Sequence, residues 1–446
     1  MRKTNFIGDV FINNRFFLCW GIIGILFLFS YFFSFLLVFS KLLMVSLAFL
    51  TLFDYVILFV PIWKIYAIRK VQKLWSNGDE NTISLRINNT YPIKLKARIV
   101  DEIPFQFQQR DFELVTVLKP NFKDNYSYTL RPTLRGEYHF GELHLFVSTL
   151  IGLVERRYTS MKEDQVKVYP SYIQIKNFQI QTIPDVKAQA GGRTTYRRGA
   201  SSEFDHIKEY NRGDDVRTIN WKASARRNQL MVNSYMDEKS QSIYCVIDKG
   251  RLMKMPFKGL SLLDYAINAS LMFSYVVLQK DDKVGLLTFS EKVSDILQPS
   301  KSKKQFNTIL EMLYNQQTQF LESNYADLFA KANKGIGQRS LLLLFTNFET
   351  YSGFERQLNY IKALNKKHLL CLVLFENTEI HKIHEERGDS VEDIYIKTIA
   401  DQFNHEKKMI LKELHKSGII AIYTSPEKLT INVVNKYIEL KSRQII

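Results

Sequence analysis

The sequence predicts a multidomain membrane protein: two N-terminal transmembrane helices, then a β-sandwich-like module, then an α/β domain with a mainly parallel sheet. Apolar residues crowd the first 63 positions, short alternating segments follow, and buried strands then alternate with helical stretches. A chain of 446 residues has room for two or three domains. The predicted boundaries are an anchor at 1–75, a β-rich module at 76–184, a polar segment at 185–241 and the α/β domain at 242–446.

Composition excludes some protein classes and points to an acidic partner. Hydrophobic residues are 46% and charged residues 24% of the chain, which is globular usage and excludes a disordered chain. Three cysteines, none in a Cys-x-x-Cys pair, argue against a secreted disulfide scaffold and a structural zinc site. The net charge of +16 favours an acidic partner surface, which could be anionic lipid, nucleic acid or an acidic protein.

Two apolar runs predict a helical hairpin in the membrane. Residues 16–40 contain no charged side chain, Lys41 follows, and a second run extends from Leu42 to Trp63. At about 1.5 Å per residue, a helix over the first run crosses a hydrocarbon core of roughly 30 Å. The run is too long for a signal peptide. We therefore expect membrane lipid around residues 16–63, with Lys41 in the turn of the hairpin.

The basic residues predict the orientation of the hairpin. They flank both apolar runs, and they are Arg2, Lys3 and Arg15 before the first and Lys64, Arg69, Lys70 and Lys73 after the second. The positive-inside rule then places both termini and all soluble domains in the cytoplasm, with two passes through the plasma (inner) membrane.

Asp54 falls in the middle of the second predicted span. An acid inside a membrane is by default a candidate for function, such as a proton relay. The alternative is a protonated acid or a hydrogen bond that pairs the two helices. The absence of a basic partner in either span favours this second interpretation.

Residues 185–241 mix opposite charges with aromatic side chains. One interpretation is a solvated linker, the usual outcome for clustered charges. The other is a network in which arginines pair with carboxylates under an aromatic lid. The interleaved Phe204, Tyr210 and Trp221 favour the network, because a solvated linker rarely contains a tryptophan.

This segment resembles the bacterial family called domain of unknown function 58. In that family a Gly-Asp-Asp step leads to an Arg, an Ile-Asp-Trp triplet and an Ala-Arg pair, and here Asn220 stands in place of the Asp. The resemblance covers roughly residues 80–300. It implies a membrane-anchored bacterial protein with a C-terminal von Willebrand factor A-like domain, and family members often accompany MoxR-type AAA+ ATPases. The residues expected to form the signature network or partner surface are Glu203, Phe204, Glu209, Tyr210, Gly213, Asp214, Asp215, Arg217, Trp221, Lys222 and Arg226.

The α/β domain carries a degenerate candidate metal site. Ser242–Asp248 is a nearly continuous apolar run that ends in an acid, at the sheet edge where open α/β sheets bind ligands. In von Willebrand factor A-like domains the pattern Asp-x-Ser-x-Ser, with a Thr and an Asp from later loops, can hold a divalent cation. Gly250 and Leu252 replace both serines here, and the remaining candidates are Asp248, Thr346 and Asn347. We therefore expect no cofactor and interpret Asp248 as an acid that orders its loop or caps a helix.

The motifs of P-loop ATPases, Gly-x-Ser-x-Gly hydrolases and His-Glu-x-x-His metalloproteases do not occur in the sequence. The favoured hypothesis is a scaffold, not an enzyme, that presents the α/β domain to a MoxR-type ATPase or an envelope protein. One alternative is an enzyme that uses acids of residues 203–215 with Asp248 as general acid and base. The other is nucleic-acid binding through Tyr196, Tyr210 and Trp221, which the interspersed acids oppose, so no nucleic acid is expected.

Overall fold

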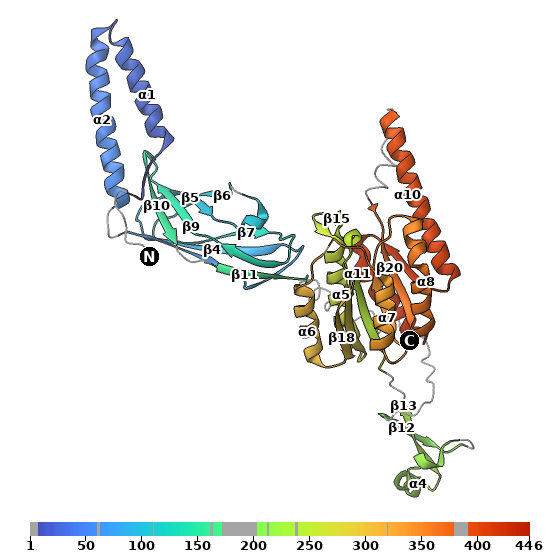
Figure 1. Ribbon diagram of the computed structural model, residues 1–446. Coiled ribbons are helices and arrows are strands. Elements are labelled where there is room, and N and C mark those ends of the chain that lie inside the picture. The colour runs from blue at the N-terminus through green and yellow to red at the C-terminus, as the bar shows by residue number, and fades with distance from the viewer. Residues whose placement is uncertain are drawn as a thin grey trace. The chain divides into compact units, whose positions relative to one another are not determined.

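The computed structural model divides the chain into two compact units, Met1–Tyr169 and Pro170–Ile446 (Figure 1). It describes residues 8–59, 63–109, 111–160, 164–171, 203–211, 214–236, 240–318, 320–378 and 391–446. The first unit contains the apolar hairpin and a β-rich body. The second contains the signature residues and a six-stranded sheet.

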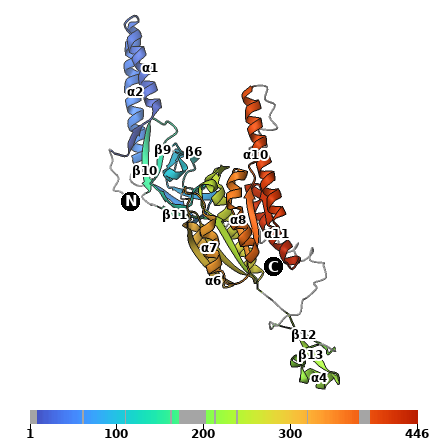
Figure 2. The same cartoon turned by 45° about the vertical axis from the view of Figure 1, so that its right-hand side comes forward.

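The apolar hairpin consists of α1 (Asn14–Phe29) and α2 (Ser34–Phe59), which run side by side in Figures 1 and 2. Large apolar side chains are exposed along both helices, as lipid-facing surfaces require. With 26 residues, α2 is long and apolar enough to cross a membrane, whereas α1 has 16. A second helix is also long and apolar enough to cross a membrane, namely α5 (Leu262–Gln279) with 18 residues. It is mostly buried in the second unit.

The turn of the hairpin differs from its predicted place. It falls at residues 30–33, inside the uncharged run, and Lys41 lies within α2. The prediction placed the turn at the first charged residue. A run without charge, proline or a turn-forming pair contains no local signal that a helix ends within it.

The chain on both sides of the hairpin enters the same β-rich body. Ahead of α1, β1 (Val10–Ile12) pairs with β10 (Val154–Ser160), and after α2, β2 (Ile65–Lys70) pairs with β4 (Asn81–Asn89). The sequence analysis assigned β1, β2 and the first two residues of β3 (Leu74–Ser76) to the anchor, whereas all three strands lie in sheets. Both flanks of the hairpin therefore lie on the same side of any membrane that it enters.

Three sheets form this body, in the orders β1-β10-β9-β5-β6, β2-β4-β7 and β3-β11-β8. Neighbouring strands are antiparallel except β3 and β11. The alternating sequence of β4 buries every second residue, as its period of two predicts. The remaining elements are β5 (Leu95–Asp101), η1 (Phe105–Phe107), β6 (Glu113–Leu118), β7 (Lys123–Leu130), β8 (Gly136–Phe140), β9 (Leu143–Ser148) and β11 (Asp164–Tyr169).

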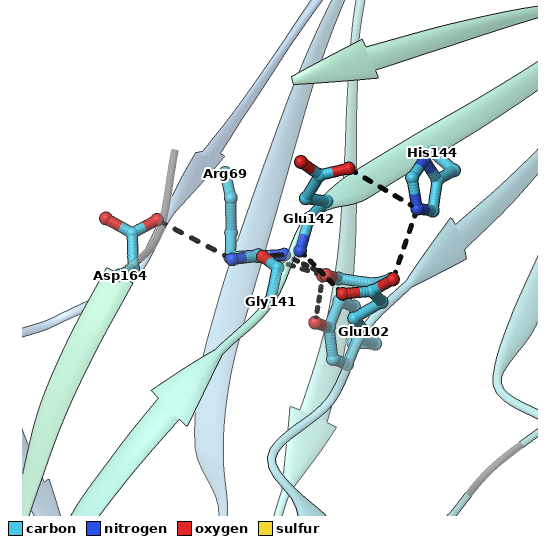
Figure 3. Close-up of polar contacts among 8 residues, drawn as sticks. Arg69, Glu102, Gly141, Glu142, His144 and Asp164 are labelled. Carbon is cyan, nitrogen blue, oxygen red and sulfur yellow. Dashed lines mark hydrogen bonds and ion pairs between the residues drawn. The ribbon is translucent and has the colours of Figure 1, made fainter. Parts of the chain in front are cut away.

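A buried ion pair joins two of these sheets. Arg69 of β2 donates to both carboxylate oxygens of Asp101 at the end of β5. Figure 3 shows Arg69 beside the carbonyl of Gly141, to which it donates at 3.0 Å, and beside Asp164, at 3.8 Å. The Tyr128 hydroxyl donates to the same Asp101 carboxylate. Burial raises the pKa of Tyr128, and the negative charge of Asp101 raises it further. Arg69 was one of the positive residues used to orient the hairpin, yet it belongs to the protein core.

The second unit is built on a six-stranded sheet in the order β18-β17-β14-β19-β20-β21. Its strands are parallel except the edge strand β18. The near-continuous apolar runs of the central strands fit a sheet that is covered on both faces. The strands are β14 (Ser242–Asp248), β17 (Lys283–Phe289), β18 (Val293–Ser300), β19 (Leu341–Phe345), β20 (Leu369–Phe375) and β21 (Ile420–Thr424).

Helices cover both faces of this sheet. One core contains residues of α5, α6 (Lys303–Tyr314) and α11 (Leu429–Ser442). The other contains residues of α7 (Tyr325–Gly335), α8 (Tyr351–Lys367) and α10 (Val391–Lys416). The alternation of strand and helix in the sequence therefore gives the expected mainly parallel sheet. Short connections complete the unit, namely η3 (Arg251–Lys254), β15 (Pro256–Phe257), β16 (Leu260–Ser261) and η4 (Pro426–Lys428).

Candidate functional site

The signature residues lie in a small module of two strands and a helix. β12 (Glu203–Glu209) pairs with β13 (Met231–Met236), and η2 (Val216–Thr218) and α4 (Trp221–Arg227) lie between them in the chain. Asn220 caps α4, because its side chain accepts a hydrogen bond from the Ala223 N–H at 3.0 Å and donates to Asn233 at 2.9 Å. The asparagine that departs from the family pattern thus still performs the capping that an aspartate would perform.

The module brings together part of the predicted network. The Lys208 ammonium donates to both oxygens of Asp214 at 2.9 Å, and Asp215 caps η2 by accepting from the Arg217 N–H. Glu209 is exposed and Tyr210 is half-buried. Gly213 lies outside the described residues, and so do the side chains of Glu203 and Phe204.

Among the residues that the structure describes, Trp221 covers no ion-pair network, and the network interpretation stays a prediction. Its residue is 71% exposed at the start of α4. In the described part of the chain, neither Arg217 nor Arg226 forms an ion pair. Lys222, Arg226 and the neighbouring Arg227 instead line a cavity of about 380 Å³. The module therefore presents an exposed indole and three cationic side chains on the same short helix.

Asp248 ends β14 at the carboxyl edge of the large sheet and is buried. Its carboxylate accepts hydrogen bonds from the Ser323 hydroxyl, from the Gly250 N–H at 2.8 Å and from the Thr346 hydroxyl at 2.7 Å. Burial raises the pKa of the Asp248 carboxyl above its usual range, and these hydrogen bonds offset part of the rise. Asp248 therefore orders three segments around the sheet edge, as its loop-ordering interpretation expects.

Ser323 is a site residue that the sequence analysis missed. A Cβ atom on Gly250 would lie 2.0 Å from the Ser323 Oγ atom and 3.1 Å from the Asp248 Oδ1 atom. The hydroxyl that the Asp-x-Ser-x-Ser pattern expects from residue 250 thus comes from the loop before α7. Ser323 lies in no motif, so the sequence contains no signal that would have identified it.

These residues do not fit a hard divalent cation. Such an ion requires about six oxygen ligands, mostly carboxylate and hydroxyl. The Asn347 side-chain oxygen accepts from the Lys407 ammonium of α10 at 2.9 Å, so a positive charge lies where the pattern has an acid. The Thr346 hydroxyl oxygen is shared between Asp248 and the Tyr325 hydroxyl. Among the described residues, no group of three or more His, Cys, Asp or Glu side chains could hold a metal ion.

Asn347 lies between two cavities at this edge. One, of about 110 Å³, includes Asp248 and Ser323, and the other, of about 460 Å³, is mostly apolar and includes Phe403. Lys407 lines the apolar cavity, where burial lowers its pKa to about 8 against the opposing effect of nearby glutamates. The edge therefore offers hydrogen bonds and apolar surface to a binding partner.

Asp54 joins the hairpin to the β-rich body. It lies close to the C-terminal end of α2, not in the middle of the span, and it is buried. Its carboxylate accepts from the N–H groups of Leu153 and Val154 at 3.0 Å and from the Thr149 hydroxyl. Its partner is thus the β9–β10 connection, and the predicted helix-pairing hydrogen bond is absent from the contacts of Asp54 in the described residues.

Two further side chains fix the same end of α2. Arg156 and the Tyr91 hydroxyl both donate to the Leu58 carbonyl, each at 2.6 Å. A cation at a helix C-terminus is favourable, and the Arg156 guanidinium also lies 4.6 Å from the centre of the Phe59 ring. The end of the apolar helix is therefore fastened to the β-rich body through Asp54 and through Arg156 and Tyr91, which share the Leu58 carbonyl.

The model of the family described as "Protein of unknown function DUF58" matches residues 206–381. This part of the chain is similar to the DUF58 family. The match includes α4, Asp248 and Ser323, so the resemblance read from the signature residues is confirmed. The uncharacterized protein YeaD of Bacillus subtilis (strain 168) is 26% identical over 196 residues, which are 42% of this chain and 49% of YeaD. The chain thus spans about half the length of that curated relative.

Similarity to solved structures is lower. The conserved hypothetical protein BatB from Bacteroides thetaiotaomicron is 12% identical, with 44% of this chain and 98% of that chain covered and a TM-score of 0.28. A CARDB domain from Pyrococcus furiosus is 14% identical, with 24% and 88% covered and a TM-score of 0.18. Scores of this size do not establish a common fold.

Proposed function

We propose that this DUF58 protein is a membrane-anchored scaffold that presents its soluble units to a protein partner. The observation that carries the proposal is the exposed Trp221 on the helix α4, which also carries Lys222, Arg226 and Arg227. Tryptophan and arginine are over-represented among the residues that dominate the energy of protein interfaces. An indole on a cationic helix adds nothing to the core of its own module, so binding is the better explanation of its exposure.

The proposed partner is a MoxR-type AAA+ ATPase, with an envelope protein as the second choice. The family resemblance suggests the ATPase, and the excess of basic residues favours an acidic surface on it. The second unit is proposed to be von Willebrand factor A-like. A mainly parallel sheet with an antiparallel edge strand, and Asp248 with Thr346 at its carboxyl edge, support that assignment.

The anchor supports the same role. The contacts of Asp54 and Arg156 hold the β-rich body against the end of α2, so a bound partner would be kept near the bilayer. Arg15 and Lys64 flank the hairpin and favour the cytoplasmic side of a bacterial plasma membrane for both soluble units.

The test uses the full-length chain in lipid nanodiscs and the purified MoxR-type ATPase of the same organism. We expect direct binding, weakened at least tenfold by Trp221→Ala and by Arg226→Ala because each removes an interface anchor. Tyr360→Ala is the matched control, since Tyr360 is an exposed aromatic residue on α8 away from the signature module in the chain. Unchanged affinity of both signature variants would refute the role of α4, and no binding of the wild-type chain would refute the ATPase as partner.

The same assay separates the nucleic-acid alternative. Single-stranded DNA would exploit Trp221 by base stacking and the basic side chains by contacts with phosphate. The exposed Glu209 and Asp215 of the same module repel phosphate, so we expect no binding of an oligonucleotide at moderate salt. Salt-sensitive binding that Trp221→Ala abolishes would favour nucleic acid over a protein partner.

A further inference from the structure

β6 is an edge strand of the five-stranded sheet in the first unit. It pairs with β5 in a regular register, from Glu113 opposite Val100 to Leu118 opposite Leu95. Within the described residues, no other strand pairs with β6. Its second side therefore presents backbone N–H and C=O groups to whatever strand can reach them.

Between Glu113 and Leu118 this edge carries no lysine, proline or β-bulge, although Lys119 and Pro120 follow it directly. Exposed edge strands of monomeric proteins commonly carry a lysine, a proline or a β-bulge. The sequence of β6 is Glu-Leu-Val-Thr-Val-Leu, and its pairing with β5 contains no shift of register. Val115 and Val117 are 68% and 51% exposed on one face, while Leu118 is buried on the other. The open edge is thus apolar and β-branched, which favours pairing.

A second copy of β6 matches this edge in sequence. If two β6 strands run antiparallel about Thr116, Val115 of each copy lies opposite Val117 of the other, on the exposed face. In the same register Glu113 of each copy lies opposite Lys119 of the other, so an attractive pair of charges closes each end. The strand is therefore complementary to itself in apolar and in charged positions.

We propose that two copies of this chain join edge to edge through β6, around a two-fold axis at Thr116. This assembly goes beyond the proposed function, and it does not depend on the identity of any other partner. A single pair of short strands buries less area than stable interfaces in solution require. Anchoring of both copies in one bilayer raises their effective concentration, so the pairing is expected in membranes and not in dilute detergent.

Cysteine cross-linking in proteoliposomes tests the register. Thr116→Cys is made in a chain with Cys19→Ser, since Cys245 and Cys371 are buried. Directly opposed residues have Cβ atoms about 5 Å apart, so mild oxidation should give a disulfide-linked dimer. Glu113→Cys is the matched control on the same strand, because its two copies would lie roughly 20 Å apart and should not cross-link. The pair Val115→Cys with Val117→Cys in one chain tests the same register on the exposed face.

Charge reversal separates specific pairing from collision in the bilayer. Glu113→Lys and Lys119→Glu should each lower the cross-linking yield of Thr116→Cys several-fold, and the two together should restore it. Both side chains are exposed, so unchanged thermal unfolding by circular dichroism serves as the folding control. Equal yields for Thr116→Cys and Glu113→Cys would overturn the proposal, because they would indicate random contact. A Thr116→Cys chain that stays monomeric, or that links to a different protein, would overturn it as well.

Discussion

Ser323 fills the space that a side chain on Gly250 would occupy, since a Cβ atom there would lie 2.0 Å from its Oγ atom. The φ angle of Gly250 is −66°, which any residue can adopt, so contact with Ser323 and not backbone strain excludes a side chain. A serine at position 250 and Ser323 are therefore alternative sources of the same hydroxyl for Asp248.

This relationship predicts non-additive effects on stability. We expect Gly250→Ser alone to lower the free energy of unfolding by about 1–3 kcal/mol, because the new side chain overlaps Ser323. Ser323→Gly alone should cost about 1–3 kcal/mol, because the buried Asp248 loses a donor. The double variant should recover most of both losses. Urea unfolding of the solubilised chain measures all three, and simple addition of the two single effects would contradict the exchange.

Replacement of Asp54 should loosen the joint between the hairpin and the sheet. Asp54→Leu leaves the N–H groups of Leu153 and Val154 without their acceptor, at a cost of about 1–3 kcal/mol each. Hydrogen–deuterium exchange in nanodiscs should show faster exchange of the β9–β10 connection. Thr51→Ala on the same helix is the control, since Thr51 bonds only within α2 among the described residues. Unchanged exchange in Asp54→Leu would show that Arg156 and Tyr91 suffice to hold the joint.

Lys407 should make the stability of the second unit rise with pH. Burial lowers its pKa in the folded state to about 8, below the usual 10.5 of a lysine. The unfolded chain therefore binds more protons between these values, and stability increases through that window by on the order of 3 kcal/mol. Below about pH 8 the cost of the buried charge is present in full. Lys407→Met should remove this slope in urea unfolding at several pH values, whatever it does to absolute stability, and an equal slope in both chains would contradict the assignment.

Iodide dissolved in water should quench the fluorescence of Trp221 more than that of the other tryptophans. Trp75 is fully buried, Trp63 is half-buried and Trp20 lies on the apolar hairpin, whereas Trp221 is exposed on a helix with three cationic residues, which attract iodide. We expect Trp221→Phe in nanodiscs to remove most of the iodide-sensitive fluorescence without a change in unfolding. If quenching persists at its full extent, the indole is covered in the intact chain.

Much of the fold could be predicted because local patterns determine it. The period of two in β4 and the apolar runs of β14, β19 and β20 reflect burial on one or two faces, which the sequence records directly. The hairpin turn could not be placed, because the residues between α1 and α2 are as apolar as the helices themselves. The strand β1 was missed because three residues have no period, and only pairing with β10 defines it.

The candidate site also contains some residues whose role local sequence predicts and others whose role it does not. Asn220 before Trp221 can be recognised from the sequence as the start of a helix. Asp248 at the end of an apolar run can be recognised as the end of a strand. The exposure of Trp221 could not be predicted, because the sequence pattern of a tryptophan among charged residues is the same whether the indole covers them or projects into water. The roles of Ser323 and Lys407 depend on contacts between distant segments, which leave no local trace.

The position of β1 ahead of the hairpin has a consequence for biogenesis. Val10 pairs with Arg156, so β1 is synthesised before a partner strand that follows both apolar helices and β2 to β9 in the chain. If the hairpin enters a bilayer during synthesis, it does so while β1 is still unpaired. The pairing of β1 with β10 is then a late step of folding, because it requires both sides of the hairpin to be present.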